Sequence, residues 1–405
     1  MNAPHTPSLL TTVEMAPRDP ILGLTEAYNA DKNPKKVNLG VGVYTGDDGK
    51  VPLLECVRRA EQQLVEQPAA RNYLPIDGLA AYDKAVQALV FGTDSPALKE
   101  GRILTVQTLG GTGGLRVGAD FLRRTAPKAT LWISNPSWEN HRAVFENAGF
   151  KVDTYAYYDA KTRGVDFDGM LAALKAMPAG DIVLLHACCH NPTGVDLSEA
   201  QWKTVADTMA ARGLVPFLDI AYQGFAESLD ADGAVVRMFA QTGMPLFVAN
   251  SFSKSFSLYG ERVGSLNVVA ASSEEGARVL SQIKRLVRAN YSNPPTHGGK
   301  IVATVLANPE LRKLWEQELG QMRDRIKSMR KLLVEKIHAR VPGVDFSFIM
   351  RQRGMFSYSG LTKEQVVRMR EEFAVYAIES GRICVAALNT KNVDYSADAI
   401  AKVIA

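Results

Sequence analysis

The sequence predicts an α/β protein with a large domain on a mostly parallel seven-stranded sheet and a smaller α+β domain. Between residues 103 and 269, seven short apolar runs alternate with amphipathic stretches of helical spacing. This alternation is typical of a parallel sheet with helices on both faces. Over residues 309–340, apolar residues recur mostly every three, four or seven positions, which predicts one long helix that leaves the sheet and enters a second domain.

The composition is that of a soluble globular protein. The chain has 405 residues, 46% of them hydrophobic and 22% charged, which is enough for two or three domains of ordinary size. Its 47 basic and 43 acidic residues are spread along the chain, so no basic patch indicates nucleic-acid binding. No apolar run is long enough to cross a membrane, and no secretory leader is recognisable at the N-terminus. We therefore expect a cytoplasmic protein that binds neither nucleic acid nor membranes.

The four cysteines favour a reducing compartment over a disulfide framework, since two of them, Cys188 and Cys189, are adjacent. The sequence His186-Ala-Cys-Cys-His190 contains metal-ligating residue types. If this segment is a strand, however, neighbouring side chains point to opposite faces and the two thiols cannot easily share one ion. We therefore expect no metal site.

The first part of the chain contains few regular elements. Residues 1–20 are rich in Pro, Thr and Ser, which predicts an extended arm of the kind that often lies on a neighbouring subunit. A short strand or turn is expected at 36–44, where glycines permit close backbone approach. A turn at 72–78 precedes a helix over 79–90.

The central part supplies the large sheet. Its strands are expected at 103–107, 130–133, 151–155, 182–186, 215–219, 246–249 and 266–269, with helices such as 115–124 and 200–212 between them. In such a sheet, ligands bind at the carboxyl ends of the strands.

The smaller domain follows the long helix. Strands are expected at 344–348, 354–358 and 382–386, with a helix over 363–379 between them. We predict a small domain formed by residues 21–48 and 310–405, and a large ligand-binding domain formed by residues 49–309.

A single lysine, Lys254, lies among serines and phenylalanines in the stretch Ser251-Phe-Ser-Lys-Ser-Phe-Ser-Leu-Tyr-Gly-Glu-Arg262. These neighbours would hold the amine partly out of water, which favours its neutral, nucleophilic form. Such a lysine can form a Schiff base with a carbonyl, including the aldehyde of pyridoxal phosphate. Taken alone, the lysine fits better with an ion-paired or snorkelling lysine on a loop, so the rest of the chain must decide.

A glycine-rich segment, Gly110-Gly-Thr-Gly-Gly-Leu-Arg116, follows a predicted strand and opens a helix. Free N–H groups at a helix start can bind a phosphate. The segment is not a dinucleotide fingerprint, because Arg116 stands where the third glycine would be, and no P-loop lysine follows. A plain glycine-rich turn is the alternative.

Polar residues follow two further strands. Asp219 ends an apolar strand and could pair with a protonated pyridine nitrogen, or else cap a helix. Tyr222 could donate a hydrogen bond to a ring oxygen, and Asn191 lies in a turn at the same sheet edge. A phosphate cradle, a carboxylate, polar groups for a ring hydroxyl and a lysine together are the set that pyridoxal phosphate requires.

At these motifs the chain resembles class I aminotransferases of fold type I, and more closely the aspartate and aromatic amino-acid aminotransferase subgroup. The resemblance extends from about Pro20 to the C-terminus. The motifs that carry it are Asn135-Pro-Ser-Trp-Glu-Asn-His141, His186-x-x-x-His190-Asn-Pro-Thr-Gly194, Asp219-x-x-Tyr222, Ser251-x-x-Lys254 with Arg262, Arg288-Ala-Asn-Tyr-Ser-Asn-Pro-Pro295 and Ser380-Gly-Arg-Ile383.

This resemblance implies pyridoxal 5′-phosphate as the cofactor and assigns a role to each motif residue. Lys254 would bind it covalently and move a proton during the reaction, while Asp219, supported by His141, would keep the ring nitrogen protonated. Tyr222 and Asn191 would bind the ring hydroxyl oxygen. The remaining implied cofactor contacts are Trp138 on the ring face, and Gly111, Thr112, Ser251, Arg262 and the neighbouring subunit's Tyr73 at the phosphate.

The resemblance also implies how substrates are held. Arg382 would bind the substrate α-carboxylate as a bidentate fork, helped by Gly42, with Trp138 and Asn191 also at the substrate. Arg288 of the partner chain would meet a distal carboxylate. Without the resemblance, a surface charge at a strand edge is the favoured interpretation of Arg382, and an ion pair within a basic helix is that of Arg288. Sites shared in this way require a homodimer.

The implied reaction is transfer of an amino group from an aromatic amino acid, aspartate or both to 2-oxoglutarate, giving a 2-oxo acid and glutamate. The segment 255–260 resembles the aromatic branch of the subgroup, whereas Asn72, Thr112 and Asn293 resemble the aspartate branch, and Thr45 matches neither. The alternatives are a strict aspartate aminotransferase and a decarboxylase, lyase or racemase on the same scaffold. A nucleotide-binding oxidoreductase and a catalytically silent binding module are more distant alternatives.

Overall fold

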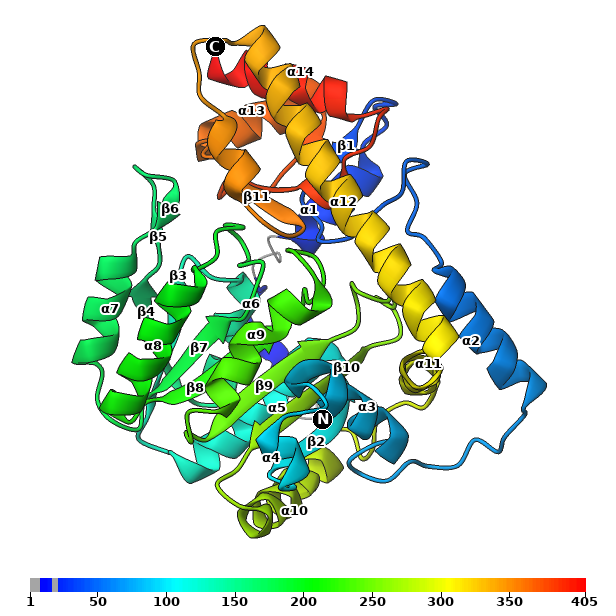
Figure 1. Cartoon of the computed structure of the whole chain (residues 1–405). Coiled ribbons are helices and arrows are strands. Elements are labelled where there is room, and N and C mark those ends of the chain that lie inside the picture. Colours follow the sequence, from blue (N-terminus) through cyan, green and yellow to red (C-terminus); the bar gives the residue numbers. More distant parts are fainter. Residues whose placement is uncertain (1–7, 17–20) are drawn as a thin grey trace, which may run out of the picture.

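The computed structural model describes residues 8–16 and 21–405 and is built around a seven-stranded sheet (Figure 1). The order across the sheet is β2-β10-β9-β8-β7-β3-β4, and β10 alone runs opposite to the other six strands. All seven predicted strands are confirmed. They are β2 (Ile103–Leu109), β3 (Thr130–Asn135), β4 (Lys151–Ala156), β7 (Ile182–His186), β8 (Val215–Ile220), β9 (Leu246–Ser251) and β10 (Val263–Val269).

The sheet is covered on both faces, because alternate residues of its strands enter two different cores. In β7, Val183 and Leu185 belong to one core and Ile182 and Leu184 to the other. The second core also receives the buried faces of α5 (Gly110–Thr125), α6 (Glu139–Asn147) and α10 (Ser273–Asn290). The first core receives α7 (Phe167–Ala176), α8 (Glu199–Arg212) and α9 (Leu229–Ala240).

The predicted long helix is α12 (Pro309–Arg340). Asn308 caps its start by accepting hydrogen bonds from the N–H groups of Glu310 and Leu311. Its apolar stripe is buried, and the indole of Trp315 donates to the carbonyl of Ser255 at 2.7 Å. In Figure 1 this helix runs from the sheet to the part of the molecule that holds the C-terminus. It therefore connects the Lys254 segment with the small sheets.

The smaller part has two short sheets. The strand β1 (Val37–Asn38) pairs in parallel with β12 (Val375–Tyr376), and β11 (Phe356–Tyr358) pairs antiparallel with β13 (Arg382–Cys384). The other elements of the chain are η1 (Leu9–Thr12), α1 (Leu22–Ala30), α2 (Glu55–Glu66), α3 (Ala80–Phe91), α4 (Pro96–Lys99), β5 (Tyr158–Asp159), β6 (Gly164–Val165), α11 (His297–Ala307), η2 (Ser347–Arg351), α13 (Lys363–Phe373), η3 (Val385–Ala387) and α14 (Val393–Ile404).

Three predictions in the smaller part were wrong in detail. The strand at 344–348 is absent, and η2 forms there because Asp345 accepts from the N–H of Ser347 at 2.7 Å and so starts a helical turn. The helix expected over 363–379 ends at Phe373, since Ala374 adopts a left-handed conformation (φ 53°) and the next residues pair with β1. The strand expected at 382–386 ends at Cys384 and continues as η3.

The predicted N-terminal arm falls partly outside the described residues, which omit 1–7 and 17–20. Within 8–16, one short turn, η1, is formed and every side chain is exposed. The apolar side chains of Leu9 and Met15 are 91% and 97% exposed.

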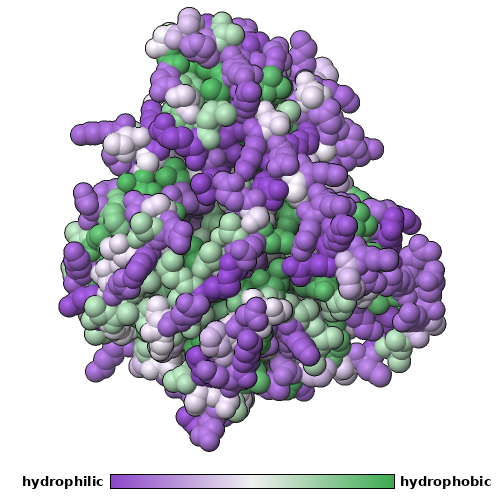
Figure 2. All heavy atoms as spheres, viewed as in Figure 1, coloured by the Kyte–Doolittle hydropathy of each residue, from purple (hydrophilic) through white to green (hydrophobic). Residues whose placement is uncertain are grey.

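No helix among the described residues has both the length and the apolar character needed to span a membrane. On the face shown in Figure 2, hydrophilic and hydrophobic residues are interspersed. The hydrophobic residues that stay exposed therefore lie in small groups on that face.

Candidate active site

A cavity of about 230 Å³ opens where the strands of the large sheet end. The carboxyl ends of β2, β3, β8 and β9 bring the residues that follow them to this edge, and the reversed strand β10 begins there, just after Arg262. The residues that line the cavity are Gly42, Gly111, Thr112, Leu115, Trp138, Asp219, Ala221, Ser251, Ser253, Lys254, Tyr259 and Arg262. Segments far apart in the sequence thus meet at one point.

Lys254 lies in the turn after β9 and is only partly accessible. Its Nζ atom is 4.9 Å from the centre of the Tyr222 ring. Burial lowers the pKa of Lys254 to about 8, with further lowering by Arg262 and Arg382 and an opposing effect of Asp219. A small but usable fraction of this amine is therefore neutral near neutral pH, and a neutral amine can attack an aldehyde.

Asp219 is 6% exposed at the end of β8 and is held by a histidine. Its Oδ2 atom lies 2.8 Å from Nε2 of His141, whose Nδ1 lies 3.0 Å from the hydroxyl of Ser137. Burial alone would raise the pKa of Asp219, but the hydrogen bond with His141 and the neighbouring cations hold it below its ordinary value. The cavity thus contains a stable carboxylate suited to a cationic ring nitrogen.

The start of α5 forms an anion cradle beside Arg262. No side chain among the described residues caps this helix, which leaves its first N–H groups available, and Gly111 and Thr112 of its first turn line the cavity. Gly110 has a φ of +66°, and a Cβ atom there would lie 2.4 Å from Nη2 of Arg262. Glycine therefore allows the guanidinium to lie against the helix start, where Arg262 is also held by the hydroxyl of Ser253 at 3.3 Å. A phosphate group fits this arrangement.

Arg382 is a buried cation, 1% exposed, that ends beside the cavity. Its Nη1 donates to Oδ1 of Asn191 at 3.1 Å and its Nη2 to the carbonyl of Gly40 at 2.7 Å. Its Nε atom is buried and has no hydrogen-bond partner, and no carboxylate of the described ranges lies within 4.0 Å of it. A buried guanidinium in this state fits a small carboxylate ligand.

Tyr222 and Asn191 lie close to this constellation without lining the cavity itself. Tyr222 is 5% exposed, and burial raises the pKa of its hydroxyl. The phenol is therefore a neutral hydrogen-bond donor at physiological pH. Asn191 is 5% exposed and is oriented by Arg382.

Two predicted site residues are not brought to this cavity within one chain. Tyr73 is 92% exposed, and Arg288 is exposed at the end of α10, where it contacts the hydroxyl of Ser292. Neither lines the cavity around Lys254.

Three residues near the site were missed in the sequence. Ser253 holds Arg262, and the hydroxyl of Tyr259 accepts a hydrogen bond from the N–H of Tyr44 at 2.9 Å. Both lie in the same serine-rich stretch as Lys254, which was a usable signal. His186 packs on His141 with ring centres 4.9 Å apart, and nothing in its sequence context indicated this contact.

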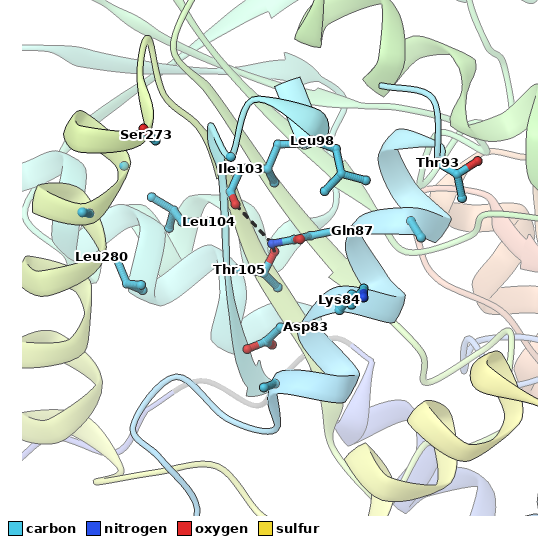
Figure 3. Close-up of a pocket in the computed structure, with 15 residues that line it drawn as sticks. Asp83, Lys84, Gln87, Thr93, Leu98, Ile103, Leu104, Thr105, Ser273 and Leu280 are labelled. Atoms are coloured by element: carbon cyan, nitrogen blue, oxygen red, sulfur yellow. Dashed lines mark hydrogen bonds between the residues drawn. The ribbon is translucent and has the colours of Figure 1, made fainter. Parts of the chain in front are cut away.

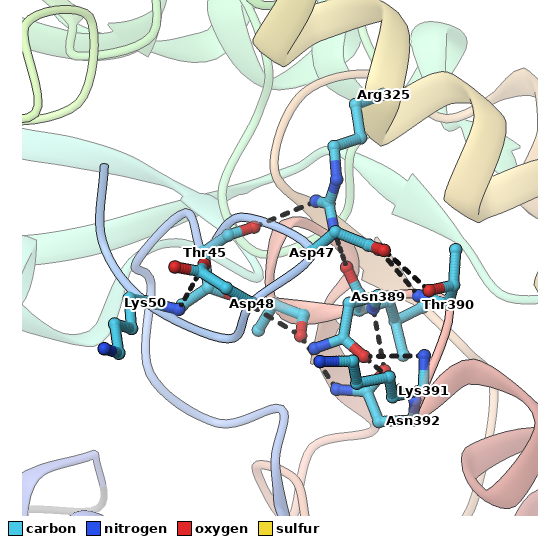
Figure 4. A network of polar contacts seen from close by, with 11 residues as sticks. Thr45, Asp47, Asp48, Lys50, Arg325, Asn389, Thr390, Lys391 and Asn392 are labelled. Atoms are coloured by element: carbon cyan, nitrogen blue, oxygen red, sulfur yellow. Dashed lines mark hydrogen bonds and ion pairs between the residues drawn. The ribbon is translucent and has the colours of Figure 1, made fainter. Parts of the chain in front are cut away.

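The loop that carries Gly42 is fastened to α12 by Arg325 (Figure 4). Its guanidinium donates to the carbonyl of Thr45 at 2.9 Å and to that of Leu388 at 2.9 Å. Asp47 joins the same network by accepting from the hydroxyl of Thr390 at 2.6 Å. One side of the cavity is thereby attached to the long helix and to the C-terminal segment.

The argument against a shared ion at Cys188 and Cys189 was wrong in its geometry. The strand β7 ends at His186, and Cys189 adopts a left-handed conformation (φ 52°), so the alternation of a strand does not apply. The two Sγ atoms and a carboxylate oxygen of Asp232 all lie within 4.8 Å of one another.

A second cavity, about 800 Å³, lies between α3, β2 and α10 (Figure 3). Gln87 crosses it and donates to the carbonyl of Ile103 at 3.2 Å and the hydroxyl of Thr105 at 3.0 Å. Oδ1 of Asp83 is buried there without a partner, and burial raises the pKa of this carboxyl to about 8. The cavity is larger than the one at Lys254 and is lined by a lysine of its own, Lys84, but among the described residues no arginine lines it and it has no anion cradle, so we do not assign the reaction to it.

Asp83 is expected to make stability depend on pH. Because its folded-state pKa of about 8 exceeds the ordinary 3.8, the free energy of unfolding should fall as pH rises between these values and stay low above them. Asp83→Asn should remove this dependence, so its gain in melting temperature over the wild type should grow up to about pH 8. Thermal unfolding of the wild type and the variant over this pH range measures the difference in melting temperature, and the exposed Asp94→Asn is the control. An equal gain at every pH would contradict the explanation.

A lysine with a lowered pKa, a carboxylate for a ring nitrogen and a phosphate cradle at the edge of this sheet define a pyridoxal-phosphate enzyme of fold type I. The model of the family "Aminotransferase class I and II" matches residues 34–400. The chain belongs to this family, and pyridoxal phosphate is its cofactor.

Characterised relatives cover almost the whole chain. It is 60% identical over 397 residues to an aspartate aminotransferase of Pseudomonas aeruginosa, covering 98% of this chain and all of that protein. It is 51% identical over 387 residues to an aromatic-amino-acid aminotransferase of Escherichia coli, covering 95% and 98%. A crystal structure of an aromatic-amino-acid aminotransferase from Burkholderia pseudomallei, covalently bound to pyridoxal phosphate, superposes with a TM-score of 0.96 at 65% identity, covering 98% and 100%. The chain is accordingly an aminotransferase.

Proposed function

We propose that this enzyme transfers the amino group of aromatic amino acids and of aspartate to 2-oxoglutarate. The observation that carries the proposal is Arg382, a buried guanidinium with a free Nε atom near a lysine of lowered pKa. It offers a fixed site for the α-carboxylate that every amino acid and 2-oxo acid possesses. The names of relatives at 60% and 51% identity support both donor classes. A strict aspartate aminotransferase is the alternative.

Pyridoxal phosphate, when bound, supplies an aldehyde that takes the substrate amine and a ring that accepts electrons from the substrate Cα. Lys254 would hold the cofactor covalently, and its amine, when free, would accept a proton from the substrate Cα and give it back. Its lowered pKa suits both tasks, because the amine must accept and release a proton near neutral pH. The carboxylate of Asp219, oriented by His141, keeps a proton on the ring nitrogen.

The other site residues position the reacting groups. Arg262 and Ser251, with the N–H groups of Gly111 and Thr112, would hold the phosphate, and Trp138, which also lines the cavity, would contact the ring. Tyr222 and Asn191 would donate hydrogen bonds to the ring hydroxyl oxygen. Arg382 orients the α-carboxylate, with the backbone at Gly42 closing that side.

We further propose a homodimer with shared sites, in which Tyr73 of one chain reaches the phosphate and Arg288 the distal substrate carboxylate of the other. Exposure of both side chains supports this, since neither has a role at its own cavity. The exposed apolar side chains of Leu9 and Met15 support an N-terminal arm, residues 1–20, that packs on the partner.

The division into domains and the location in the cell also remain proposals. Residues 21–48 and 310–405 would form the small domain and residues 49–309 the large one, which is supported by the separate small sheets joined through α12. The cytoplasm is proposed as the compartment, supported by four buried cysteines that are all free.

Arg288→Ala is expected to separate the two donor classes. It should lower kcat/KM for aspartate about 10- to 100-fold, since a charged hydrogen bond contributes about 1.5–3 kcal/mol. The value for phenylalanine should change far less, because its ring makes no ion pair. A panel of donors with 2-oxoglutarate measures this, and Arg285→Ala, exposed on the same helix, is the control. If the wild type turns over phenylalanine and tyrosine negligibly compared with aspartate, the alternative of a strict aspartate aminotransferase is correct.

Mixing the inactive Lys254→Ala variant with the Arg288→Ala variant, which is impaired toward aspartate, tests the shared sites. A hybrid of one Lys254→Ala chain and one Arg288→Ala chain has one site with both residues intact if Arg288 acts on the partner. Aspartate activity should then reappear after refolding the mixture. If each chain uses its own Arg288, the mixture stays at the level of the separate variants.

A further inference from the structure

The thiols of Cys188 and Cys189 and the carboxylate of Asp232 lie close together. Cys188 and Cys189 are 6% and 2% exposed, and both Sγ atoms lie within 4.8 Å of each other and of a carboxylate oxygen of Asp232. Ligands around a tetrahedral thiolate-bound cation stand about 3.5–4 Å apart, as follows from metal–sulfur bonds of about 2.3 Å and metal–oxygen bonds of about 2.0–2.2 Å. The observed spacing accommodates such an ion with only small side-chain adjustments.

The backbone directs both thiols to the same place. The strand β7 has ended at His186, and the N–H groups of Cys189 and His190 both donate to Asp196 at 2.8 Å. This clamp holds Cys189 in its left-handed conformation, in which few residues other than glycine are found. The arrangement of the thiol pair is therefore built into the turn.

Asp232 is held in place by backbone N–H groups of the loop that precedes its helix. Its Oδ2 accepts from the N–H groups of Gly224 and Ala226, at 2.8 and 2.9 Å, and its Oδ1 accepts from the N–H of Glu227 at 3.0 Å. An ionised carboxylate offers about four lone-pair positions. The backbone N–H of Ser228 also acts on this carboxylate, so an ion at Asp232 would share or replace that contact, while the other three backbone hydrogen bonds hold the carboxylate in place.

A buried arginine, Arg330, can balance the negative charge that the two thiols and the carboxylate carry when an ion is bound. Arg330 is 3% exposed, donates only to the hydroxyl of Ser357 and the carbonyls of Gly354 and Phe356, and has no carboxylate within 4.0 Å among the residues that the structure describes. Its charge acts on Cys189, and that of Arg353 on Asp196. A buried cation beside thiols, without a carboxylate of its own, stabilises thiolates.

A route for an ion exists. Cys188, Asp196 and Asp232 line a cavity of about 550 Å³, together with Glu227 and Arg353. The cavity has room for water, which can complete the coordination of an ion bound at the three side chains.

We propose that Cys188, Cys189 and Asp232 form a binding site for a single thiophilic cation of the zinc or cadmium type, with water from the cavity as the fourth ligand. On binding, each thiol releases its proton to solvent as its sulfur–metal bond forms, and no electron is transferred. The site is separate from the cofactor cavity, which none of its three ligands lines.

The free thiols are weak acids, which limits their reactivity when no ion is bound. Burial raises the pKa of Cys189 to about 11, and the neighbouring thiol and burial raise the pKa of Cys188. Without an ion, both groups therefore stay protonated at neutral pH. Affinity for a metal should rise steeply with pH, because about two protons leave for each ion bound.

Cadmium is the probe of choice, since its thiolate bonds absorb in the ultraviolet. Holoenzyme freed of metal with a chelator is titrated with Cd²⁺, and the difference absorbance and the bound ion per chain are measured. We expect one ion per chain, a thiolate-to-metal band, and a loss of affinity in Cys188→Ser and Cys189→Ser of more than about 100-fold, beyond what outer-shell changes cause. The controls are Cys56→Ser and Cys384→Ser, which change the other two buried cysteines and should leave binding unchanged.

The same titration can overturn the proposal. Absence of a thiolate band at one equivalent of Cd²⁺, or equal binding by the wild type and both Cys188→Ser and Cys189→Ser, would exclude the site. Loss of binding in a control variant would place the ion elsewhere. Since Cys188→Ser and Cys189→Ser are tested separately, one variant that fails to fold does not prevent the decision. Circular dichroism and cofactor content identify such a failure.

Discussion

Lys254→Ala is expected to abolish amino transfer, lowering kcat by more than about 10⁴-fold, the upper range for a single acid–base group. The substitution removes both the covalent anchor of the cofactor and the group that carries the substrate proton. Burial of this amine and the neighbouring arginines set its pKa at about 8, and no other lysine lines the cavity. Formation of glutamate from 2-oxoglutarate, with an amino donor in excess, measures the effect.

The matched control is Lys313→Ala, an exposed lysine on α12. It should keep wild-type kcat and KM. The Lys254→Ala variant should still bind pyridoxal phosphate non-covalently through Arg262 and the start of α5, which separates lost chemistry from lost folding. Turnover within about tenfold of wild type would contradict the assignment of Lys254 as the proton carrier.

Asp219→Asn is expected to have the second largest effect, a fall in kcat of about 10³-fold, comparable with removal of a strong electrostatic contact in other enzymes. The amide keeps the shape of the side chain but cannot stabilise a proton on the ring nitrogen, so the ring accepts electrons from the substrate poorly. Because the pKa of Asp219 is held below its ordinary value, the wild-type carboxylate stays charged over the whole working range of pH. The loss in the variant should therefore not be recovered by raising the pH.

Steady-state kinetics over pH, with cofactor affinity measured separately, tests this expectation. Asp153→Asn, a partly exposed carboxylate on β4, is the control. If Asp219→Asn kept kcat but bound the cofactor weakly, Asp219 would only anchor the ring and would not affect the electron demand of the reaction.

Much of the large domain was predictable, because its strands are buried on both faces and read as continuous apolar runs. β7 was predicted to the residue, and the starts of the other strands agree except for β10, whose beginning includes Gly264 and Ser265. Because these two residues are small or polar, the apolar pattern did not mark the start of this strand. In the structure these positions are buried because the backbone of β10 passes close to Gly110.

The smaller part was predicted less well, because its elements are short and depend on distant partners. Val375 and Tyr376 pair with Val37 and Asn38 across almost the whole chain, and no local pattern records such a contact. The left-handed turn at Ala374 that ends α13 carries no glycine signal either.

For the candidate site, the sequence motifs identified the residues at the strand ends. They did not show the hydrogen bonds and charges around these residues. The hydrogen bond between Asp219 and His141 was implied only by resemblance, and the orphaned Nε of Arg382 required coordinates. The convergence of Cys188, Cys189 and Asp232 was hidden because it depends on one backbone angle and on a helix some forty residues further along.

The central claim is that Lys254 is the covalent anchor of pyridoxal phosphate in a cavity built for amino transfer. The most direct test is to reduce the holoenzyme with borohydride, digest it, and locate the pyridoxyl group by mass spectrometry. We expect one modified residue, Lys254, and loss of this modification when an amino donor is added before the reductant, since the donor displaces the lysine. A pyridoxyl group on another lysine, or none on Lys254 in active enzyme, would contradict it.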